Sequence, residues 1–356
     1  MRTEIGERHR TDNLDLLEAE GQRLMGPGQQ EARKQLDAEA GNLRLALRQT
    51  LDQGDWDRMQ QVLAYWLLYL EMHGFPGETF ETLRPIIAAA REMKDRQPAW
   101  IAPRSVLALA LAAWHFFGGR IRTPGTQEAL KESIVLAQTL PNTLEKGFTL
   151  LLDSSGPGLS TNEALALASE AVAIFQAHRH LWGQAMAQLV WADAASFGER
   201  DYAQAEAVYR NSQKMFEMLE NRWGQALCLW GLAYIAFERQ EYSAALNLGE
   251  AGLGIHRGLN DPWRIGGTLS ALARYAATAG DYERARSYWE ENLALAFAHG
   301  QRSTAAHLLG ELSKIARRQG DVREAKDYLA KGLALYQELG DAEGVEQVKR
   351  ELTALD

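Results

Sequence analysis

Cysteines, prolines and long apolar runs are all scarce in this sequence of 356 residues. The single cysteine, Cys228, excludes an intramolecular disulfide and a zinc site built from several cysteines, and it suits a reducing cytoplasm. No apolar run reaches about 18 residues without a charge, so no membrane span is expected. Most of the nine prolines stand at apparent helix edges, and 46% of the residues are hydrophobic. These features predict a folded, all-α protein.

Basic residues are outnumbered, which bears on possible partners. The sequence has 38 basic and 47 acidic residues, for a net charge of −9. A general nucleic-acid binder needs a basic surface, so direct nucleic-acid binding is not expected. The N-terminus, with Glu4, Glu7 and several arginines, lacks the apolar core of a signal peptide. We therefore expect a cytoplasmic protein that does not bind membranes.

The motifs of common catalytic sites are missing as well. The sequence contains neither a G-x-x-x-x-G-K-[ST] phosphate loop nor a G-x-S-x-G nucleophile elbow. His178 and His180 are two residues apart, which points them to different sides of a helix, and no carboxylate stands at metal-ligand spacing. Cys228 lies on an apolar stretch, as a buried small residue does. We expect no enzyme activity, no cofactor and no metal.

The second half of the chain repeats every forty residues. An acidic residue recurs at a polar break, at Asp201, Glu241, Asp281 and Asp321. An alanine recurs four residues later, at Ala205, Ala245, Ala285 and Ala325. A fixed period of this length indicates stacked units that cannot bury their apolar faces alone. The alternative, an ordinary helical bundle with accidental periodicity, does not explain four aligned units.

Each unit has the pattern of two helices joined by a short polar turn. Apolar residues follow three- and four-residue steps in 227–238 and again in 242–255. Gly280 and Gly320 can adopt the left-handed conformation that ends a helix, and the following aspartate can cap the next one. This pattern resembles the tetratricopeptide (TPR) repeat in a forty-residue form. The resemblance implies a right-handed superhelical solenoid in which each repeated alanine faces the partner helix closely.

A second resemblance concerns the N-terminal region. The sequence E-x-x-N-L-R-x-A-L, from Glu39 to Leu47, stands within a segment similar to the start of the C-terminal sensor region of STAND-type signal-transduction ATPases, which include large LuxR-like transcriptional regulators. In that family the segment follows a nucleotide-binding domain and leads into TPR-like repeats. No nucleotide-binding domain precedes it here, so we interpret the chain as an excised sensor or a stand-alone relative. The resemblance implies a nucleotide-binding ATPase module, in the same or another chain, as a partner.

Four regions follow from these patterns. Residues 1–95 form the N-terminal helical segment, residues 96–180 form irregular TPR-like pairs, residues 181–341 form four regular repeats, and residues 342–356 form a capping helix. The regular repeats align only if the first one contains one extra residue near Glu199. Trp182, Trp223 and Trp263 stand at equivalent positions, which favours packing between repeats over ligand binding.

The aligned repeats also indicate where a ligand would bind. In TPR-like arrays the first helix of each repeat lines the concave groove, which by analogy receives an aromatic wall, a basic end and one acid. The candidate ligand-binding residues are Asp193, Trp230, Tyr234, Phe237, Arg274, Lys314 and Arg317. Aromatic faces bury apolar ligand surface, and arginine binds carboxylates or phosphates through two hydrogen bonds. Packing of the aromatics between helices, with the arginines as plain surface, is the competing interpretation.

The leading functional hypothesis is a ligand-sensing TPR scaffold that belongs to a STAND regulator. Its concave groove would bind a peptide, a protein segment or a small anionic inducer. The alternative hypothesis is a stand-alone TPR adaptor that holds a partner protein without sensing. An enzyme with an unrecognised site is a third and weaker interpretation, because no acid, base or nucleophile can be placed in a cleft.

Overall fold

The computed structural model describes residues 2–73, 76–93, 101–120 and 123–355. Within these ranges the chain forms seventeen α-helices and one π-helical segment, and no strand is found there. The all-α fold expected from the sequence is therefore confirmed. The chain divides into two compact units, Met1–Cys228 and Leu229–Asp356, so the division falls inside one helix of the second regular repeat. This division is not apparent in the sequence.

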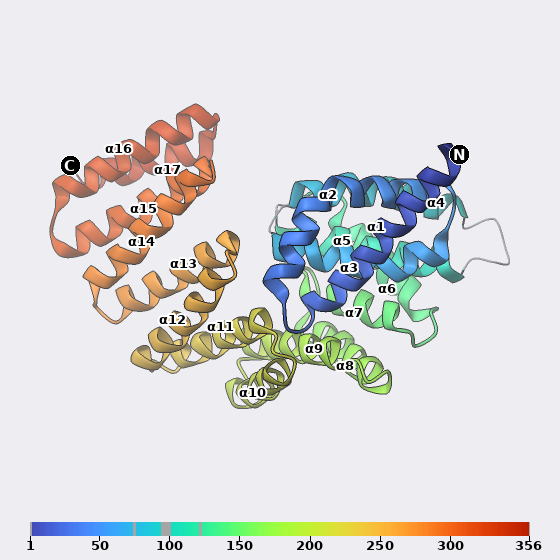
Figure 1. Cartoon of the computed structure of the whole chain (residues 1–356). Helices are drawn as coiled ribbons and strands as arrows, with labels where there is room; N and C mark the ends of the chain where they lie inside the picture. Colours follow the sequence, from blue (N-terminus) through green and yellow to red (C-terminus); the bar gives the residue numbers. More distant parts are fainter. Residues whose placement is uncertain (1, 74–75, 94–100, 121–122, 356) are drawn as a thin grey trace. The chain divides into compact units, whose positions relative to one another are not determined.

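The first unit is built from helices that pack with their neighbours in the chain (Figure 1). Alternate helices also pack together, as α1 does with α3 and α3 with α5. The helices are α1 (Arg2–Leu24), α2 (Gln29–Asp52), α3 (Trp56–His73), α4 (Pro76–Glu92), α5 (Ile101–Arg120), α6 (Thr126–Gln138), α7 (Leu144–Ser155), α8 (Thr161–Ala177), α9 (Leu181–Ala194), α10 (Tyr202–Met218) and the first part of α11 (Arg222–Glu238).

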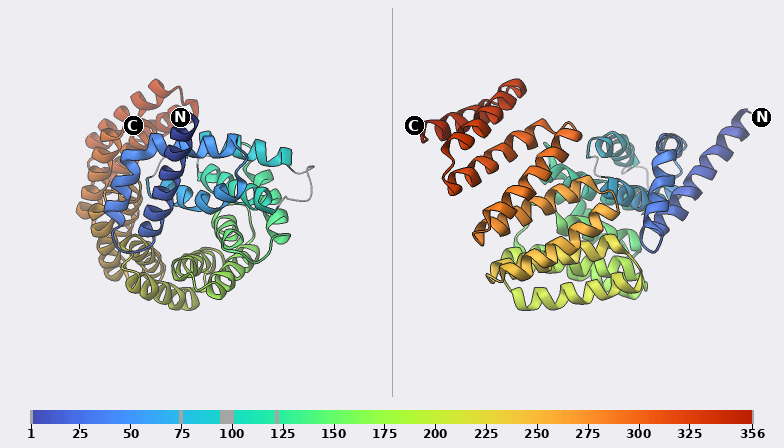
Figure 2. Two further views of the ribbon diagram at one scale, coloured as in Figure 1. Left: turned by 45° about the vertical axis from the view of Figure 1, so that its right-hand side comes forward. Right: turned by 60° about the vertical axis from the view of Figure 1, so that its left-hand side comes forward.

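The second unit is also built from helices that pack with their neighbours in the chain. After α11 come α12 (Tyr242–Gly258), α13 (Pro262–Thr278), α14 (Tyr282–Ala298), α15 (Arg302–Gln319), α16 (Val322–Leu339) and α17 (Ala342–Thr353). Each helix from α12 to α17 packs against the next, so these helices stack in chain order (Figure 2). The capping position predicted for residues 342–356 corresponds to α17, which packs on α16.

The repeated alanines share one environment. Each of the four is fully buried, at Ala205, Ala245, Ala285 and Ala325. The acidic residues of the turns also act alike: the side chains of Asp201, Asp281 and Asp321 each accept a hydrogen bond from a backbone amide in the first turn of the next helix. Glu241 stands at the same place without such a bond. The forty-residue period therefore reflects repeated helix pairs.

A left-handed residue ends the first helix of each regular repeat. Gly280 and Gly320 have φ values of 84° and 86°, as the sequence predicts. Arg200 and Gln240 occupy the equivalent turns with φ values of 58° and 64°, although a side chain makes this conformation less favourable. The turn geometry is thus set by the helix packing of every repeat, whether or not glycine is present.

The extra residue of the first repeat has a structural counterpart. Residues Ala195–Glu199 form a π-helical segment at the end of α9, where the sequence alignment requires one additional residue near Glu199. Such a segment accommodates an insertion within a helix by widening one turn. The chain thereby keeps Asp201 and Ala205 in the positions that the other repeats give to their equivalents.

The structure also bears on two further expectations from the sequence, the packing of the repeated tryptophans and the absence of a membrane span. Trp182 and Trp223 are 5% and 2% exposed, consistent with packing between repeats, whereas Trp263 is 46% exposed and does not share that packing. Residues Ile101–Gly118 of α5 are long and apolar enough to cross a membrane by length and composition, although they include Arg104. However, 72% of this window is buried inside the fold, as in the core helix of a folded unit.

The predicted division at residues 95 and 96 lies outside the described residues. The other two divisions, at 180–181 and 341–342, coincide with the starts of α9 and α17. The functional meaning of these four regions stays a prediction.

Candidate functional site

A cavity of about 800 Å³ lies within the second unit. Its walls come from α11, α13 and α15, which are the first helices of their repeats, and from two aromatic residues of α14. The lining residues are Trp230, Gly267, Ser270, Ala271, Arg274, Ala277, Thr278, Tyr282, Trp289, His307, Glu311, Lys314, Ile315 and Arg318. This volume is in the range of protein sites for small molecules and short peptides.

The helical period explains why these residues meet. On α13 the cavity residues Gly267, Ser270 and Arg274 are three and four positions apart, so they lie along one face of the helix. On α15 the same spacing aligns His307, Glu311, Lys314 and Arg318. The opposite face of each helix is apolar, which fixes the direction of the cavity stripe.

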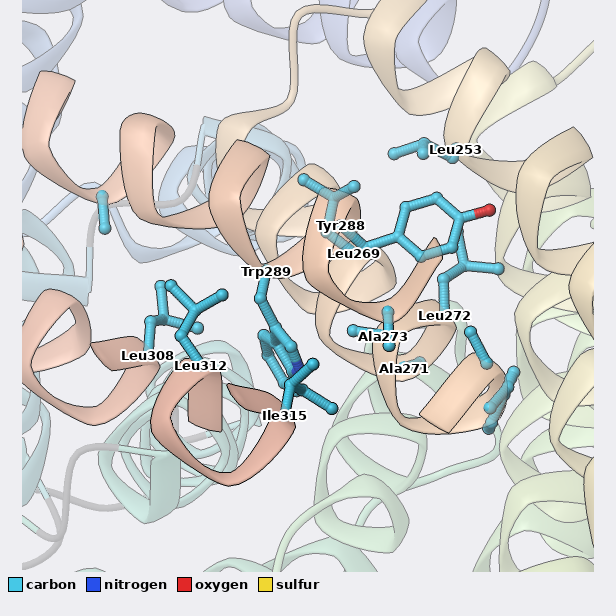
Figure 3. Close-up of a cluster of buried hydrophobic side chains, with 14 of the residues drawn as sticks. Leu253, Leu269, Ala271, Leu272, Ala273, Tyr288, Trp289, Leu308, Leu312 and Ile315 are labelled. Atoms are coloured by element: carbon cyan, nitrogen blue, oxygen red, sulfur yellow. The ribbon is translucent and has the colours of Figure 1, made fainter. Parts of the chain in front are cut away.

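One side of the cavity is formed by a buried hydrophobic cluster. Trp289 is 6% exposed and belongs to this cluster together with Leu312 and Ile315 of α15. Figure 3 shows the Trp289 ring next to Ile315, with Leu308 and Leu312 to one side of it. Because Trp289 and Ile315 belong both to the cluster and to the cavity lining, the floor of the site is continuous with the packed core.

Aromatic rings hold Arg274 in place. Its guanidinium carbon lies 6.0 Å from the centre of the Phe237 ring and 5.9 Å from that of Tyr275. The two rings are themselves stacked, with their centres 4.5 Å apart. An arginine over aromatic faces is favourable and loses less freedom when it binds an anion. Burial raises the pKa of Tyr275 to about 12, so its hydroxyl stays protonated at neutral pH.

The cavity lining has more basic than acidic side chains, with Arg274, Lys314 and Arg318 against Glu311. Lys314 forms an ion pair with Glu311, with 2.6 Å between Nζ and Oε1. Among the residues that the structure describes, no carboxylate forms an ion pair with Arg274 or Arg318. The cavity thus contains one ion-paired lysine and two arginines for which the described residues provide no ion pair. This arrangement favours an anionic group within the cavity.

Comparisons with known proteins yield structural neighbours only. No protein-family model matches the sequence, and no curated protein matches it. A Rap protein solved in complex with Competence and Sporulation Factor superposes with a TM-score of 0.58 at 11% identity, covering 97% of this chain and 98% of that one. The STAND protein PH0952 from Pyrococcus horikoshii, which has a tetratricopeptide repeat sensor, gives a TM-score of 0.55 at 14% identity. This chain is covered to 88%, and PH0952 to 49%.

The apo form of the quorum sensor NprR from B. thuringiensis is a third neighbour. Its TM-score is 0.52 at 11% identity, with 100% of this chain and 99% of that chain covered. These likenesses agree with the repeated helix pairs, the buried alanines and the capped turns. The chain has a TPR-like repeat fold.

In this TPR-like protein the cavity includes three of the seven candidate ligand-binding residues. Trp230, Arg274 and Lys314 line it. Phe237 stacks under Arg274 and packs against the core cluster, so it supports the arginine rather than lining the cavity. Tyr234 and Arg317 are also absent from the lining. Whether these residues bind a ligand stays a prediction.

Asp193 belongs to the first unit and has a role within it. Its carboxylate accepts a hydrogen bond from the hydroxyl of Tyr209, a fully buried residue of α10. Burial, followed by the charge of Asp193, raises the pKa of Tyr209. Tyr209 thereby fixes the orientation of the partly exposed Asp193 side chain.

Sequence reasoning missed Glu311 and Arg318, although a signal for both was present. Counting from His307, the steps to Glu311, Lys314 and Arg318 are four, three and four residues, which is the period of one helix face. Arg317 stands one residue earlier, about 100° around the helix from Arg318. Among the described residues no group of three His, Cys, Asp or Glu side chains could hold a metal ion. Cys228 is fully buried, and burial raises its pKa to about 12.

Proposed function

We propose that the protein is a ligand-sensing TPR scaffold whose second unit binds a peptide or a small anionic ligand in the cavity between α11, α13 and α15. The observation that carries this proposal is the presence of Arg274 and Arg318, without acidic partners among the described residues, in a cavity with aromatic walls. Guanidinium groups bind carboxylates and phosphates, and the aromatic walls bury the apolar part of the ligand.

The neighbours support a binding role for such a fold. The Rap protein was solved with Competence and Sporulation Factor, and PH0952 is described as having a repeat sensor. Sensing requires two arrangements of the protein with different affinity for the ligand. In the family that the N-terminal motif resembles, the response would pass to a nucleotide-binding ATPase module. A role as an adaptor, which binds a partner segment without changing its own arrangement, is the second candidate.

The test of ligand binding uses the arginines. A thermal-shift and calorimetric screen of short peptides and anionic metabolites identifies a ligand, and its affinity is then measured for Arg274→Gln with Arg318→Gln. We expect at least a tenfold loss of affinity, because hydrogen bonds to charged groups contribute about 1.5–3 kcal/mol. Arg323→Gln is the control, since Arg323 is exposed on α16 and does not line the cavity. Unchanged affinity in the double variant would exclude this cavity as the binding site.

The same ligand separates a sensor from an adaptor. Amide hydrogen exchange of the full chain, with and without ligand, reports which helices change. A sensor is expected to show altered exchange in helices that do not line the cavity, such as α16 and α17. Protection confined to α11, α13, α14 and α15 would instead favour the adaptor role.

A further inference from the structure

Gly267 is an unusual member of the cavity wall. It stands in the middle of α13, where glycine is less favourable than alanine. A Cβ atom added to Gly267 would have nothing within 4 Å. Some helical glycines of the chain are explained by packing, since a Cβ atom on Gly183 or Gly224 would lie 2.4 Å from a phenylalanine ring, whereas Gly254 and Gly310 also have open space but do not line the cavity. No such neighbour accounts for Gly267, which instead leaves open space on the cavity side of α13.

An aromatic residue lines the same cavity. Trp230 of α11 is partly exposed, and the uncovered backbone of α13 at Gly267 forms part of the same wall. A glycine allows a ligand to approach the helix backbone closely, and an indole face favours contact with another ring. The two together suit a flat aromatic group better than a branched aliphatic one.

The two cavity arginines, Arg274 and Arg318, lie away from Gly267 along the cavity wall. Arg274 follows Gly267 by seven residues on the same helix face, which corresponds to about 10 Å along the axis. Arg318 of α15 lines the cavity too, and Lys314 adds a further cation paired with Glu311. The wall therefore has an uncovered, aromatic part and a basic part, separated by about two helical turns.

We propose that the ligand of this cavity combines a planar aromatic ring, placed over Gly267 beside Trp230, with an anionic group about 10 Å away at Arg274 and Arg318. The inference rests on the proposed function and specifies the ligand class of the same site. Two sources offer this chemistry, a nucleoside polyphosphate and a short acidic peptide with an aromatic residue at its other end.

The experiment uses two matched pairs of probes on the full-length chain. ATP is compared with inorganic triphosphate, and the peptide Trp-Ala-Ala-Glu is compared with Ala-Ala-Ala-Glu, each by isothermal titration calorimetry. The members of a pair share the anionic part and differ in the aromatic ring. We expect the ring to improve affinity at least about tenfold in one pair, as buried aromatic contacts do. The pair that responds identifies the source.

Two glycine variants test where the ring lies. Gly267→Leu fills the open space, and we expect it to abolish the advantage of the ring while the protein stays folded, since no neighbour would clash with the new Cβ. Gly254→Leu is the matched control, because Gly254 is an exposed helical glycine of the same unit with equal free space and does not line the cavity. Circular dichroism and the unfolding temperature establish that both variants fold.

The outcomes separate this inference from the proposed function. Equal affinity for ring-bearing and ring-free probes would overturn the claim that the ligand contains an aromatic ring. If Arg318→Gln then abolished the binding of these probes, anion binding in the cavity would still be supported. A ring advantage that survives in Gly267→Leu overturns the placement. Absence of binding by all four probes at about 1 mM also overturns the inference, whereas the proposed function is decided by the arginine double variant.

Discussion

Asp153 is a fully buried carboxylic acid whose hydrogen bonds indicate its protonation state. The Ser133 hydroxyl oxygen lies 3.0 Å from the Ala108 carbonyl oxygen and 2.9 Å from Asp153 Oδ2. A hydroxyl group has a single hydrogen, so it cannot donate to both. A protonated Asp153 resolves this: its O–H donates to Ser133, and Ser133 donates to Ala108. Burial raises the pKa of Asp153 well above its ordinary value, in agreement with a neutral acid.

We therefore expect Asp153→Asn to be tolerated. At pH 5 its free energy of unfolding should lie within about 1 kcal/mol of the wild type, because an amide can replace the donating O–H. The folded-state pKa is above the unfolded one, so the wild type loses stability as the pH rises from about 4 toward the folded-state pKa. The variant lacks this loss. Urea unfolding at pH 5 and pH 8 measures it, and a variant that is less stable than the wild type at pH 8 would show that Asp153 is ionised.

His256 should affect the pH dependence of stability in the opposite direction to Asp153. It is 2% exposed, and burial, assisted by the charge of Arg264, lowers its pKa to about 3. The imidazole is thus neutral in the folded protein and charged in the unfolded chain below about pH 6.5. Its contribution to stability is complete above pH 6.5 and is lost as the pH falls toward 3.

Acid should therefore destabilise the second unit through this residue. Each unit of pKa difference corresponds to about 1.4 kcal/mol, so the loss is on the order of 3–5 kcal/mol near pH 3. His256→Gln removes the titration, and the slope of unfolding free energy against pH between 4 and 6 should be smaller in this variant. His307→Gln, at an exposed histidine of the same unit, serves as the control. Equal slopes in the wild type and His256→Gln would contradict the assignment.

At the scale of the element, glycines and aromatic rings join consecutive repeats. Gly183 near the start of α9 is packed under Phe175 of α8, and Gly224 of α11 is packed under Phe216 of α10. Both phenylalanines are fully buried. A Cβ atom at either glycine would lie 2.4 Å from the ring, which is too close for any side chain. The absence of a side chain lets the second helix of one repeat pack closely against the first helix of the next.

We expect Gly183→Ala and Gly224→Ala each to destabilise the protein by about 1–3 kcal/mol, the usual result of overpacking. Gly254→Ala is the matched change at a helical glycine with open space, and it should stabilise by up to about 1 kcal/mol through helix propensity. Thermal unfolding followed by circular dichroism compares the three variants. Similar effects of all three changes would mean that propensity, rather than the ring contact, sets the result.

The repeated elements were predictable from the sequence because their signals are local. Ala205 and its three equivalents recur every forty residues, and the capping aspartates precede the helices they cap. The candidate site was less predictable because it depends on the direction in which each side chain points around its helix axis. Arg318 rather than Arg317 lines the cavity, and Phe237 lies beneath Arg274, since one residue turns the side chain by about 100°. The exposure of Trp263 has no local signal, because it depends on the neighbouring helices.

At the scale of the molecule, contacts distant in sequence tie the first helix pair to the middle of the chain. The Asn221 side chain donates a hydrogen bond to the Leu24 carbonyl, 197 residues away, over 3.1 Å. Gln29 donates to the same carbonyl and accepts a hydrogen bond from the Trp223 amide. Asn221 also accepts one from the Gly224 amide. Asn221 and Gln29 are buried, so this polar contact is shielded from water.

We expect Asn221→Ala to weaken this contact and to expose two distant segments together. The Leu24 carbonyl keeps its hydrogen bond from Gln29, but the buried Gly224 amide loses its acceptor, which costs about 1–3 kcal/mol. Hydrogen exchange should then accelerate both around Leu24 in the α1–α2 turn and at the start of α11, because the Asn221 side chain forms hydrogen bonds to both segments. Asn211→Ala is the control: Asn211 is exposed, bonds only to Gln188 among the described residues, and should change stability by less than about 0.5 kcal/mol. Faster exchange at α11 alone, with the α1–α2 turn unchanged, would show that the two segments are held independently, so that the first helix pair depends on its own packing.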